Sequence, residues 1–570
     1  MKPRRFQRGR NQPAPRPRRS SHGPRFAVAV VAAVAVVLAA AACGGSSGSG
    51  GAVKEGGVYR LGSASSIDSL NPFVAFQADA YSTFEYIYPY LVQYNPKLQF
   101  VPDFARSWQE SPDGKTWTFH TQPNAKWSDG KPLTAYDAAW TFTTTLKFQS
   151  GPTANTAGTV AHMVSAKAPN ATTLVVTYKQ PVANVLSQLQ QMPILPEHIW
   201  SKYAAGAGKA LTTFTNPAPI VSGGPFILEK YTPKQIALFK RNPSFYGPKP
   251  HIEGLGLQFF QTYDAEITAL KAGQLDGIET VPPTSVATLK AAHFVVRESP
   301  GNIWDDFIIN SNPQQDASHK ELLNPLLRQA FDVAIDRRQI VETSLLGYGQ
   351  PGSSIIPPAT GHWYDPSIKP APFSLARANQ LLDQAGYKMG PNGVRIADGH
   401  PMSYTVIMPA DTTGSYGERS FQIIQTDFKK IGVQLNPKNL DNSAAYDAIL
   451  ANNYKTFELS MWDWQALIDP DFMLSVLTCG SFNVWNDTGY CTKNYDSMYQ
   501  QQGAALNPAQ RQQIVYQMQQ MISNERPYLV IDYADLIEAH STNWAGLPLV
   551  AGNSWTELSK IPFESVHLAG

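Results

Sequence analysis

A chain of 570 residues is longer than a single hydrophobic core can serve, so it must divide into several lobes. Strand-like and helix-like segments are mixed along its whole length, for example a strand pattern at 56–64 and helix patterns at 135–146 and 326–335. This mixture predicts an α/β fold with two or three lobes. The high apolar content of 43% against 16% charged residues is typical of a globular chain and not of a disordered one.

Local signals place several helix ends and turns. Thr134, Asp336 and Ser374 each precede a helical run and are good N-terminal caps. The other signals are Asn324-Pro325 at a helix start, Gly347 and Gly386 at helix ends, and the turn pairs Asp113-Gly114 and Asp129-Gly130.

The N-terminus has three parts that together predict export. Residues 1–25 are basic, residues 26–42 are apolar, and Cys43 is followed by a Gly/Ser run. We expect a signal peptide over 1–42, a lipid on Cys43 and a tether over 43–55, so that the protein is extracytoplasmic and membrane-anchored. Ala40 stands where a lipoprotein pattern prefers Leu, and the alternative is an uncleaved transmembrane anchor, since 17 apolar residues could just span a bilayer.

The charge of the body differs from that of the whole chain. The formal net charge is +2, but nine Lys or Arg and no acid lie in the first 26 residues, so the chain from Cys43 onward has a net charge of −7. An acidic body argues against a nucleic-acid partner.

Two cysteines remain if Cys43 carries lipid. Outside the cytoplasm Cys479 and Cys491 are expected to form a disulfide. The alternative for a spaced cysteine pair is a metal site, but the sequence shows no nearby cluster of His or further Cys.

No motif predicts an enzyme, a cofactor or a metal centre. The Gly-x-Ser-x-Gly match at 44–48 lies in the tether, without a strand-turn-helix context. The Gly-x-Gly-x-x-Gly match at 347–352 follows a helix and contains Pro351, so we interpret it as a helix-ending turn. An exported hydrolase is therefore only a remote alternative.

A series of short motifs resembles the family 5 extracellular solute-binding proteins, the oligopeptide, dipeptide and nickel-type group, over nearly all of 56–570. The central part is A-x-S-W, D-G-x-x-W-x-F and K-W-S-D-G-x-P-x-T-A-x-D between 105 and 137. The motifs occur at 102–108, 111–119, 126–137, 194–199, 223–226, 241–243, 246–250, 271–276, 328–330, 334–337, 381–382 and 385–387. Each motif alone is weak, but their order and spacing together are specific.

The resemblance implies a three-lobed, periplasmic-binding-protein-like fold. Lobe I would combine 56–83, 196–300 and 536–570, lobe II would span 84–195, and lobe III would span 301–535. A ligand would lie between lobes I and III, which would close around it by a hinge motion. The resemblance also implies a substrate-binding protein that acts as a monomer and delivers its ligand to an ABC permease and ATPase, with no catalytic residues of its own.

By the same resemblance, ligand meets three segments of the chain. The expected contacts are Ser65 and Ser66 after the first strand, Asn310 in the strand entering lobe III, and Trp462, Asp463, Trp464, Gln465 and Asp469 in the segment 459–470. Two Trp around an Asp suit an aromatic cleft with polar anchors, in which Asp463 or Asp469 pairs with a ligand amine. The alternative is that one Trp belongs to the core and Asp469-Pro470 is a turn.

One departure from the family bears on the ligand. Peptide binders of the family place an Asp shortly after this strand to hold the free α-amine, and here Gln465 or Ala466 stands at that position. Either Asp463 substitutes for it or the ligand lacks a free amine. A di- or oligopeptide is the favoured ligand, with an oligosaccharide, haem or a metal chelate as alternatives.

Overall fold

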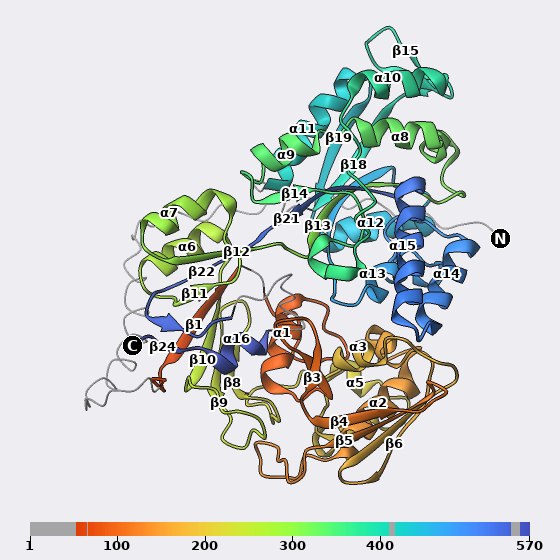
Figure 1. Ribbon diagram of the computed structural model, residues 1–570. Helices are drawn as coiled ribbons and strands as arrows, with labels where there is room; N and C mark the ends of the chain where they lie inside the picture. Colours follow the sequence, from red (N-terminus) through yellow and green to blue (C-terminus); the bar gives the residue numbers. More distant parts are fainter. Residues whose placement is uncertain (1–52, 65, 410–415, 549–558) are drawn as a thin grey trace, which may run out of the picture. The chain divides into compact units, whose positions relative to one another are not determined.

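The computed structural model describes residues 53–64, 66–409, 416–548 and 559–570 (Figure 1). Residues Val53–Gly570 form one compact unit in which strands and helices are mixed, which confirms the predicted α/β class. The predicted signal peptide, the lipidation site Cys43 and the ligand contact Ser65 lie outside the described residues. No helix in the described part of the chain is both long and apolar enough to cross a membrane.

The first sheet has seven strands drawn from three distant parts of the chain. Their order is β12 (Val295–Ser299), β22 (Leu536–His540), β11 (Gly277–Ile278), β1 (Val58–Ser63), β10 (Gly254–Phe259), β9 (Ile236–Arg241) and β8 (Phe226–Thr232). The central strand β1 runs parallel to both β10 and β11, and β22 is antiparallel to β11 and β12. The associated helices include α1 (Ala78–Ile87), α6 (Tyr263–Lys271), α7 (Val286–Ala291) and α16 (Lys560–Ser565).

The second sheet has four antiparallel strands, and its last two strands are exchanged relative to their order in the chain. Its order is β4 (Ala105–Glu110), β5 (Thr116–Thr121), β7 (Thr173–Tyr178) and β6 (Met163–Asn170). Helix α2 (Ala135–Phe148) contacts β6 and β7, and α3 (Val185–Gln190) follows them in the chain (Figure 1). The predicted turn at Asp113-Gly114 joins β4 to β5, with Gly114 at a φ of 67° that favours glycine.

The first and second sheets share one hydrophobic core. A single buried cluster contains Leu61 and Leu257 from the first sheet together with Phe119 and Val176 from the second. Because the two sheets bury the same apolar cluster, they are expected to move as one body.

The third sheet has six strands and a buried cluster on each face. Its order is β14 (Gly349–Pro351), β21 (Tyr528–Ala534), β13 (Ile303–Ile309), β20 (Leu459–Gln465), β18 (Ser403–Pro409) and β19 (Gln434–Leu440). Alternate residues of β13 enter different clusters: Phe307 and Ile309 enter one, and Trp304 and Ile308 enter the other. Helices therefore cover both faces of this sheet (Figure 1).

The helices of this part are α8 (Pro325–Val333), α9 (Arg337–Thr343), α10 (Leu375–Gln384), α11 (Tyr416–Lys430), α12 (Asn442–Tyr454), α13 (Asp471–Ser475), α14 (Lys493–Ala504) and α15 (Pro508–Glu525). A small sheet of β15 (Lys388–Met389), β16 (Arg395–Ala397) and β17 (His400–Pro401) lies between α10 and β18 in the chain.

The predicted helix starts are confirmed by their hydrogen bonds. The Thr134 side chain caps α2 in a reciprocal capping box with Asp137, Asp336 accepts from the Gln339 amide, and Ser374 accepts from the Arg377 amide. These caps explain why α2, α9 and α10 begin where the sequence places them.

The chain crosses between the first and third sheets twice. It leaves β12 at Ser299 and enters β13 at Ile303, and it returns from β21 at Ala534 to β22 at Leu536. Residues 300–302 and Asp535 are therefore the two crossings between these sheets.

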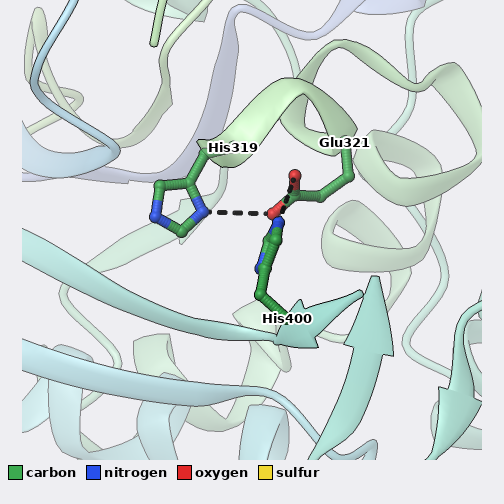
Figure 2. Close-up of side chains that lie close together, drawn as sticks. All are labelled: His319, Glu321 and His400. Carbon is green, nitrogen blue, oxygen red and sulfur yellow. Dashed lines mark hydrogen bonds and ion pairs between the residues drawn. The ribbon is translucent and has the colours of Figure 1, made fainter. Parts of the chain in front are cut away.

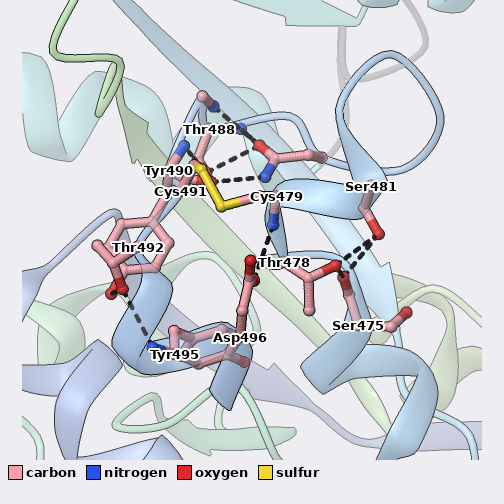
Figure 3. Close-up of a disulfide and its surroundings, with 12 residues drawn as sticks. Ser475, Thr478, Cys479, Ser481, Thr488, Tyr490, Cys491, Thr492, Tyr495 and Asp496 are labelled. Atoms are coloured by element: carbon pink, nitrogen blue, oxygen red, sulfur yellow. Dashed lines mark hydrogen bonds between the residues drawn. A yellow bond between two sulfur atoms is a disulfide. The ribbon is translucent and has the colours of Figure 1, made fainter. Parts of the chain in front are cut away.

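The predicted disulfide between Cys479 and Cys491 is confirmed (Figure 3). The Cys479 amide donates to the Asp496 carboxylate at 3.0 Å, so the same loop is also tied to the start of α14. The pair closes a short loop in the third-sheet part of the chain.

Replacing both cysteines by serine should lower the free energy of unfolding by about 3 kcal/mol, because the unfolded chain loses the constraint of a closed loop. Urea denaturation of the oxidised protein and of the double variant measures this difference. Reduced wild type should match the variant; a wild type whose stability is unaffected by reduction would contradict the assignment.

Candidate functional site

Three aspartates form a row across neighbouring strands of the third sheet. Asp305 on β13 is paired directly with Asp463 on β20 and with Asp532 on β21. Directly paired residues of antiparallel strands project from the same face of a sheet. We call Asp305, Asp463 and Asp532 the carboxylate row. It lies close to both crossings, because Asp305 is near the start of β13 and Asp532 is near the end of β21.

The row is buried at one end and exposed at the other. Asp532 is fully buried, Asp305 is 8% exposed and Asp463 is exposed. Among the described residues, both oxygens of Asp532 and Oδ2 of Asp305 have no other hydrogen-bond donor, and the two carboxyls lie close enough to share a proton with each other. Buried like charges on adjacent strands repel, so a proton or a bound cation is needed here.

The burial of Asp305 and Asp532 raises the pKa values of their carboxyl groups. Burial raises the pKa of Asp532 to about 7. Burial, and then the charges of Asp532 and Asp463, raise the pKa of Asp305 well above its ordinary value. The positive charge of Arg337 opposes this rise in the pKa of Asp532. The guanidinium of Arg337, however, donates its hydrogen bonds to Asp332 and to the Val530 carbonyl.

The structure separates the two tryptophans of the predicted site from the aspartate between them. Because 459–465 is a strand, Trp462 and Trp464 pair with Asp306 and Trp304 and project from the face opposite to Asp463. Both indoles are half-buried against the cluster that contains Trp304. The single aromatic cleft with a polar anchor that the sequence suggested is therefore divided between two faces.

The tryptophan face has acidic groups of its own. Trp464 Nε1 donates to Asp487 at 3.1 Å, and the Tyr528 hydroxyl donates to the other oxygen of Asp487. Burial raises the pKa of Asp487 to about 7, and burial followed by the charge of Asp487 raises the pKa of Asp306. Both oxygens of the fully buried Asp306 have no partner among the described residues.

Asp469 is held by a fixed partner. Arg511 donates to its two oxygens at 2.7 Å each, and the side chains of both residues are buried. The Ser187 hydroxyl of α3 also donates to Asp469 at 3.3 Å, so this carboxylate connects the segment after β20 to the second-sheet part of the chain. These bonds give Asp469 a structural role and occupy the oxygens that the sequence had offered to a ligand amine.

The other predicted contacts have varied environments. Asn310 is fully buried, donates to the carbonyls of Tyr454 and Phe457 and accepts from the Asn312 amide, so its side chain fixes a loop. Gln465 is half-buried at the end of β20, and Ser66 is half-buried after β1.

The first sheet has a second group of buried acids, near the end of β1. Ser63 donates to Asp79 at 3.0 Å, and Glu266 is 1% exposed with no partner for either oxygen among the described residues. Burial and then Asp79 raise the pKa of Glu266 to about 8, and burial followed by Asp79 and Glu266 raises that of Glu279. Asp79 and Glu266, like Asp305 and Asp532, were not identified from the sequence.

A concavity of about 880 Å³ lies elsewhere, on α2, β6 and β7. Its lining includes Tyr136, Trp140, Lys167 and Glu197, and no predicted ligand contact. It is broad and mostly apolar, so we assign the candidate site to the acidic strands of the third sheet.

Comparison with known proteins finds a matching family and relatives of similar sequence. Residues 99–483, more than half of the chain, match the family described as bacterial extracellular solute-binding proteins, family 5 Middle. The chain is 28% identical over 502 residues to Protein XP55 of Streptomyces lividans, covering 85% of each chain.

Three solved structures share the fold. The ABC transporter substrate-binding protein CtaP of Listeria monocytogenes has a TM-score of 0.75 at 20% identity, covering 91% of this chain and 100% of its own. The oligopeptide-binding protein AppA of Bacillus subtilis, in complex with a nonapeptide, has a TM-score of 0.78 at 21% identity, with coverage of 91% and 100%. NikZ of Campylobacter jejuni, in complex with Ni(L-His), has a TM-score of 0.78 at 18% identity, with coverage of 90% and 99%. At these identities the likeness concerns the fold alone.

Replacing Arg511 by Met should lower the free energy of unfolding by roughly 3–5 kcal/mol, because it leaves the Asp469 carboxylate buried without its cation. Urea denaturation at neutral pH measures the loss. Arg338→Met is the matched control, since the Arg338–Glu342 pair is exposed and its loss should leave the free energy of unfolding nearly unchanged. Equal effects of the two substitutions would contradict the structural role of Asp469.

Stability should depend on pH through Asp532. Its folded pKa of about 7 lies above the ordinary value of 3.8, so the folded protein holds this proton more tightly than the unfolded chain. The stabilisation is complete at low pH and is lost as pH rises from about 4 to about 7, by up to roughly 1.4 kcal/mol per pH unit.

Asp532→Asn removes this titration, so the ligand-free variant should gain stability relative to wild type as pH rises. Urea denaturation of both proteins across that pH range measures the difference. A difference that does not vary with pH would contradict the assignment.

Proposed function

Because this chain belongs to the family 5 bacterial extracellular solute-binding proteins, and so has the substrate-binding role of an ABC transporter, we propose that its ligand is a di- or oligopeptide bound through its amine. The observation that carries this proposal is the carboxylate row. The family is one of binding proteins rather than enzymes. The open question is therefore which solute is bound and by which residues.

Asp463 is the proposed amine anchor. It is the exposed member of the row, while the carboxylates of Asp305 and Asp532 are buried beside it. An ammonium group at Asp463 would favour the ionised form of the paired Asp305 carboxyl, whose pKa is raised in the ligand-free protein. This arrangement supplies the negative charge that Gln465 or Ala466 does not provide after the strand.

The acids beside β1 support a ligand with additional positive charge. Glu266 is buried without a hydrogen-bond partner among the described residues, and Glu279 and Asp79 interact with it. A basic side chain of a peptide would match this group. Ser65, Ser66 and Gln465 remain proposed contacts of the ligand. Trp462 and Trp464 remain proposed contacts only for a part of the ligand that passes the end of β20 to the face opposite to Asp463.

We further propose that lobe I comprises 56–83, 196–300 and 536–570, lobe II 84–195 and lobe III 301–535. The two crossings at 300–302 and Asp535 coincide with the boundaries of lobe III and would serve as the hinge. The shared core of the first two sheets supports movement of lobes I and II as one body against lobe III.

We also propose that the protein is attached to the cell membrane through a lipid on Cys43. Export by the signal at 1–42 and lipidation of Cys43 would hold the protein at the outer side of the membrane, beside its permease and ATPase. A Cys43→Ser variant released into the medium would support this; one that remains membrane-bound would favour an uncleaved anchor.

The ligand proposal predicts a dependence on a free amine. A mixed tripeptide library should raise the melting temperature of the purified protein, whereas the same library with acetylated N-termini should raise it much less. Asp463→Asn should weaken binding of any tripeptide that gives a shift by about 10-fold or more in calorimetry, because a charge-assisted hydrogen bond is lost.

Asp447→Asn is the matched control, because Asp447 is an exposed aspartate on α12 of the same part of the chain. Its affinity should equal that of wild type. Equal shifts with free and acetylated libraries, or wild-type affinity of Asp463→Asn, would reject the amine anchor; no shift with either library would reject a peptide ligand.

A further inference from the structure

We propose that His319, Glu321 and His400 form a site for a divalent transition-metal ion, with Zn²⁺ as the ion that suits their donor atoms (Figure 2). His319 and Glu321 lie in the 3-10 segment η4 (Ala317–Leu323), and His400 begins β17. This segment follows the C-terminal end of β13, whereas Asp305 lies near the N-terminal end of that strand. The site is therefore separate from the carboxylate row and does not depend on the proposed ligand.

The three donor atoms already lie near the spacing of a coordination shell. Nδ1 of His319 is 3.2 Å from Oε1 of Glu321, and Nε2 of His400 is 3.5 Å from Oε2 of the same carboxylate. The donor atoms of all three residues lie within 4.8 Å of one another. Tetrahedral bonds of about 2.0–2.1 Å place neighbouring ligand atoms roughly 3.3 Å apart, so an ion would require only a small adjustment.

Neighbouring groups orient these donors. The Tyr404 hydroxyl donates to Oε1 of Glu321 at 2.8 Å, and Nε2 of His319 lies 3.2 Å from the Glu458 carboxylate. With the ion on Nδ1, the Nε2–H of His319 would donate to Glu458. Carboxylates that accept from the second nitrogen of a ligating histidine are a regular feature of metal sites.

Unsatisfied buried atoms are the second observation that indicates an ion. Glu321 is 2% exposed, and its Oε2 atom and the Nε2 atom of His400 make no hydrogen bond among the described residues; their one contact is with each other, at 3.5 Å, and it is an ion pair only with a proton on His400. A proton on His319 explains the contacts of His319 with Glu321 and Glu458, but these two atoms would need a second positive charge. A cation between them would satisfy both.

The site is accessible from solvent, and the protein supplies three of the four ligands of a tetrahedral ion. The side chains of His319 and His400 are 20% and 27% exposed, so an ion can enter from outside. Three protein ligands leave a fourth position for water. A bound ion would connect η4 to the small sheet of β15, β16 and β17, two segments that are far apart in the sequence.

The test is metal binding by the purified, chelator-treated protein. Zn²⁺ alone is titrated against a chromophoric competitor at about pH 7.4, and bound zinc is counted by elemental analysis. One Zn²⁺ per chain is expected, and His400→Ala should weaken its binding at least ~10-fold. His198→Ala is the matched control, because His198 is similarly exposed and lies 2.9 Å from a single carboxylate, Asp129; it should retain wild-type affinity.

Two further measurements keep the outcome decisive. Circular dichroism establishes that each variant is folded, and His400→Gln replaces His400→Ala if the latter is not. Co²⁺ bound to wild type should give the intense visible absorption of a four-coordinate ion rather than the weak bands of a six-coordinate one. No bound Zn²⁺, unchanged affinity in both His400 variants, or a six-coordinate Co²⁺ spectrum would overturn the proposal.

Discussion

Carboxylates that are buried without a fixed cation are the constraint on which the rest of this structure depends. Other buried acids of the chain have such a cation: Asp103 has Lys560, Asp332 has Arg337 and Arg526, and Asp469 has Arg511. Asp305 and Asp532 have no such cation among the described residues, although they lie in the middle of a sheet. A fold that provides cations for several of its buried acids, and leaves Asp305 and Asp532, like Asp306 and Glu266, without one, is suited to a positively charged ligand.

The position of the carboxylate row connects ligand binding to the proposed movement of the lobes. Asp305 and Asp532 flank the two crossings between the first and third sheets, at 300–302 and Asp535. In the proposed function, a cation bound at the row would relieve repulsion beside the hinge, so ligand binding and lobe closure would favour each other. The shared core of the first two sheets would make the remainder of the molecule the rigid partner in that motion.

Local sequence signals predicted much of the fold. The caps Thr134 and Ser374 depend only on nearby residues, so the sequence predicts them directly. The cysteine pair was predicted from the expected extracytoplasmic location and from the even number of cysteines left beside Cys43. The motif series between 102 and 387 also predicted the family, and the family match over residues 99–483 confirms it.

The candidate site was predicted less well, because it depends on pairing between distant strands. Asp305 meets Asp532 only through the register of β13 with β21, and no local pattern specifies that register. Strand alternation alone would have separated Asp463 from Trp462 and Trp464, and the two adjacent aspartates in the apolar strand 303–309 were a signal that could have been noticed. The partner of Asp469 and the meeting of His319 with His400 required the tertiary structure.

Native mass spectrometry of the protein as purified is the most direct test of a peptide amine bound at the carboxylate row, because it identifies any ligand retained from the cell. The wild-type protein should carry an adduct whose mass fits a short peptide, and the Asp463→Asn variant should lack it. An adduct that carries no cationic group, such as a neutral oligosaccharide, would contradict the role assigned to the carboxylate row, while the family and its transport role would stand.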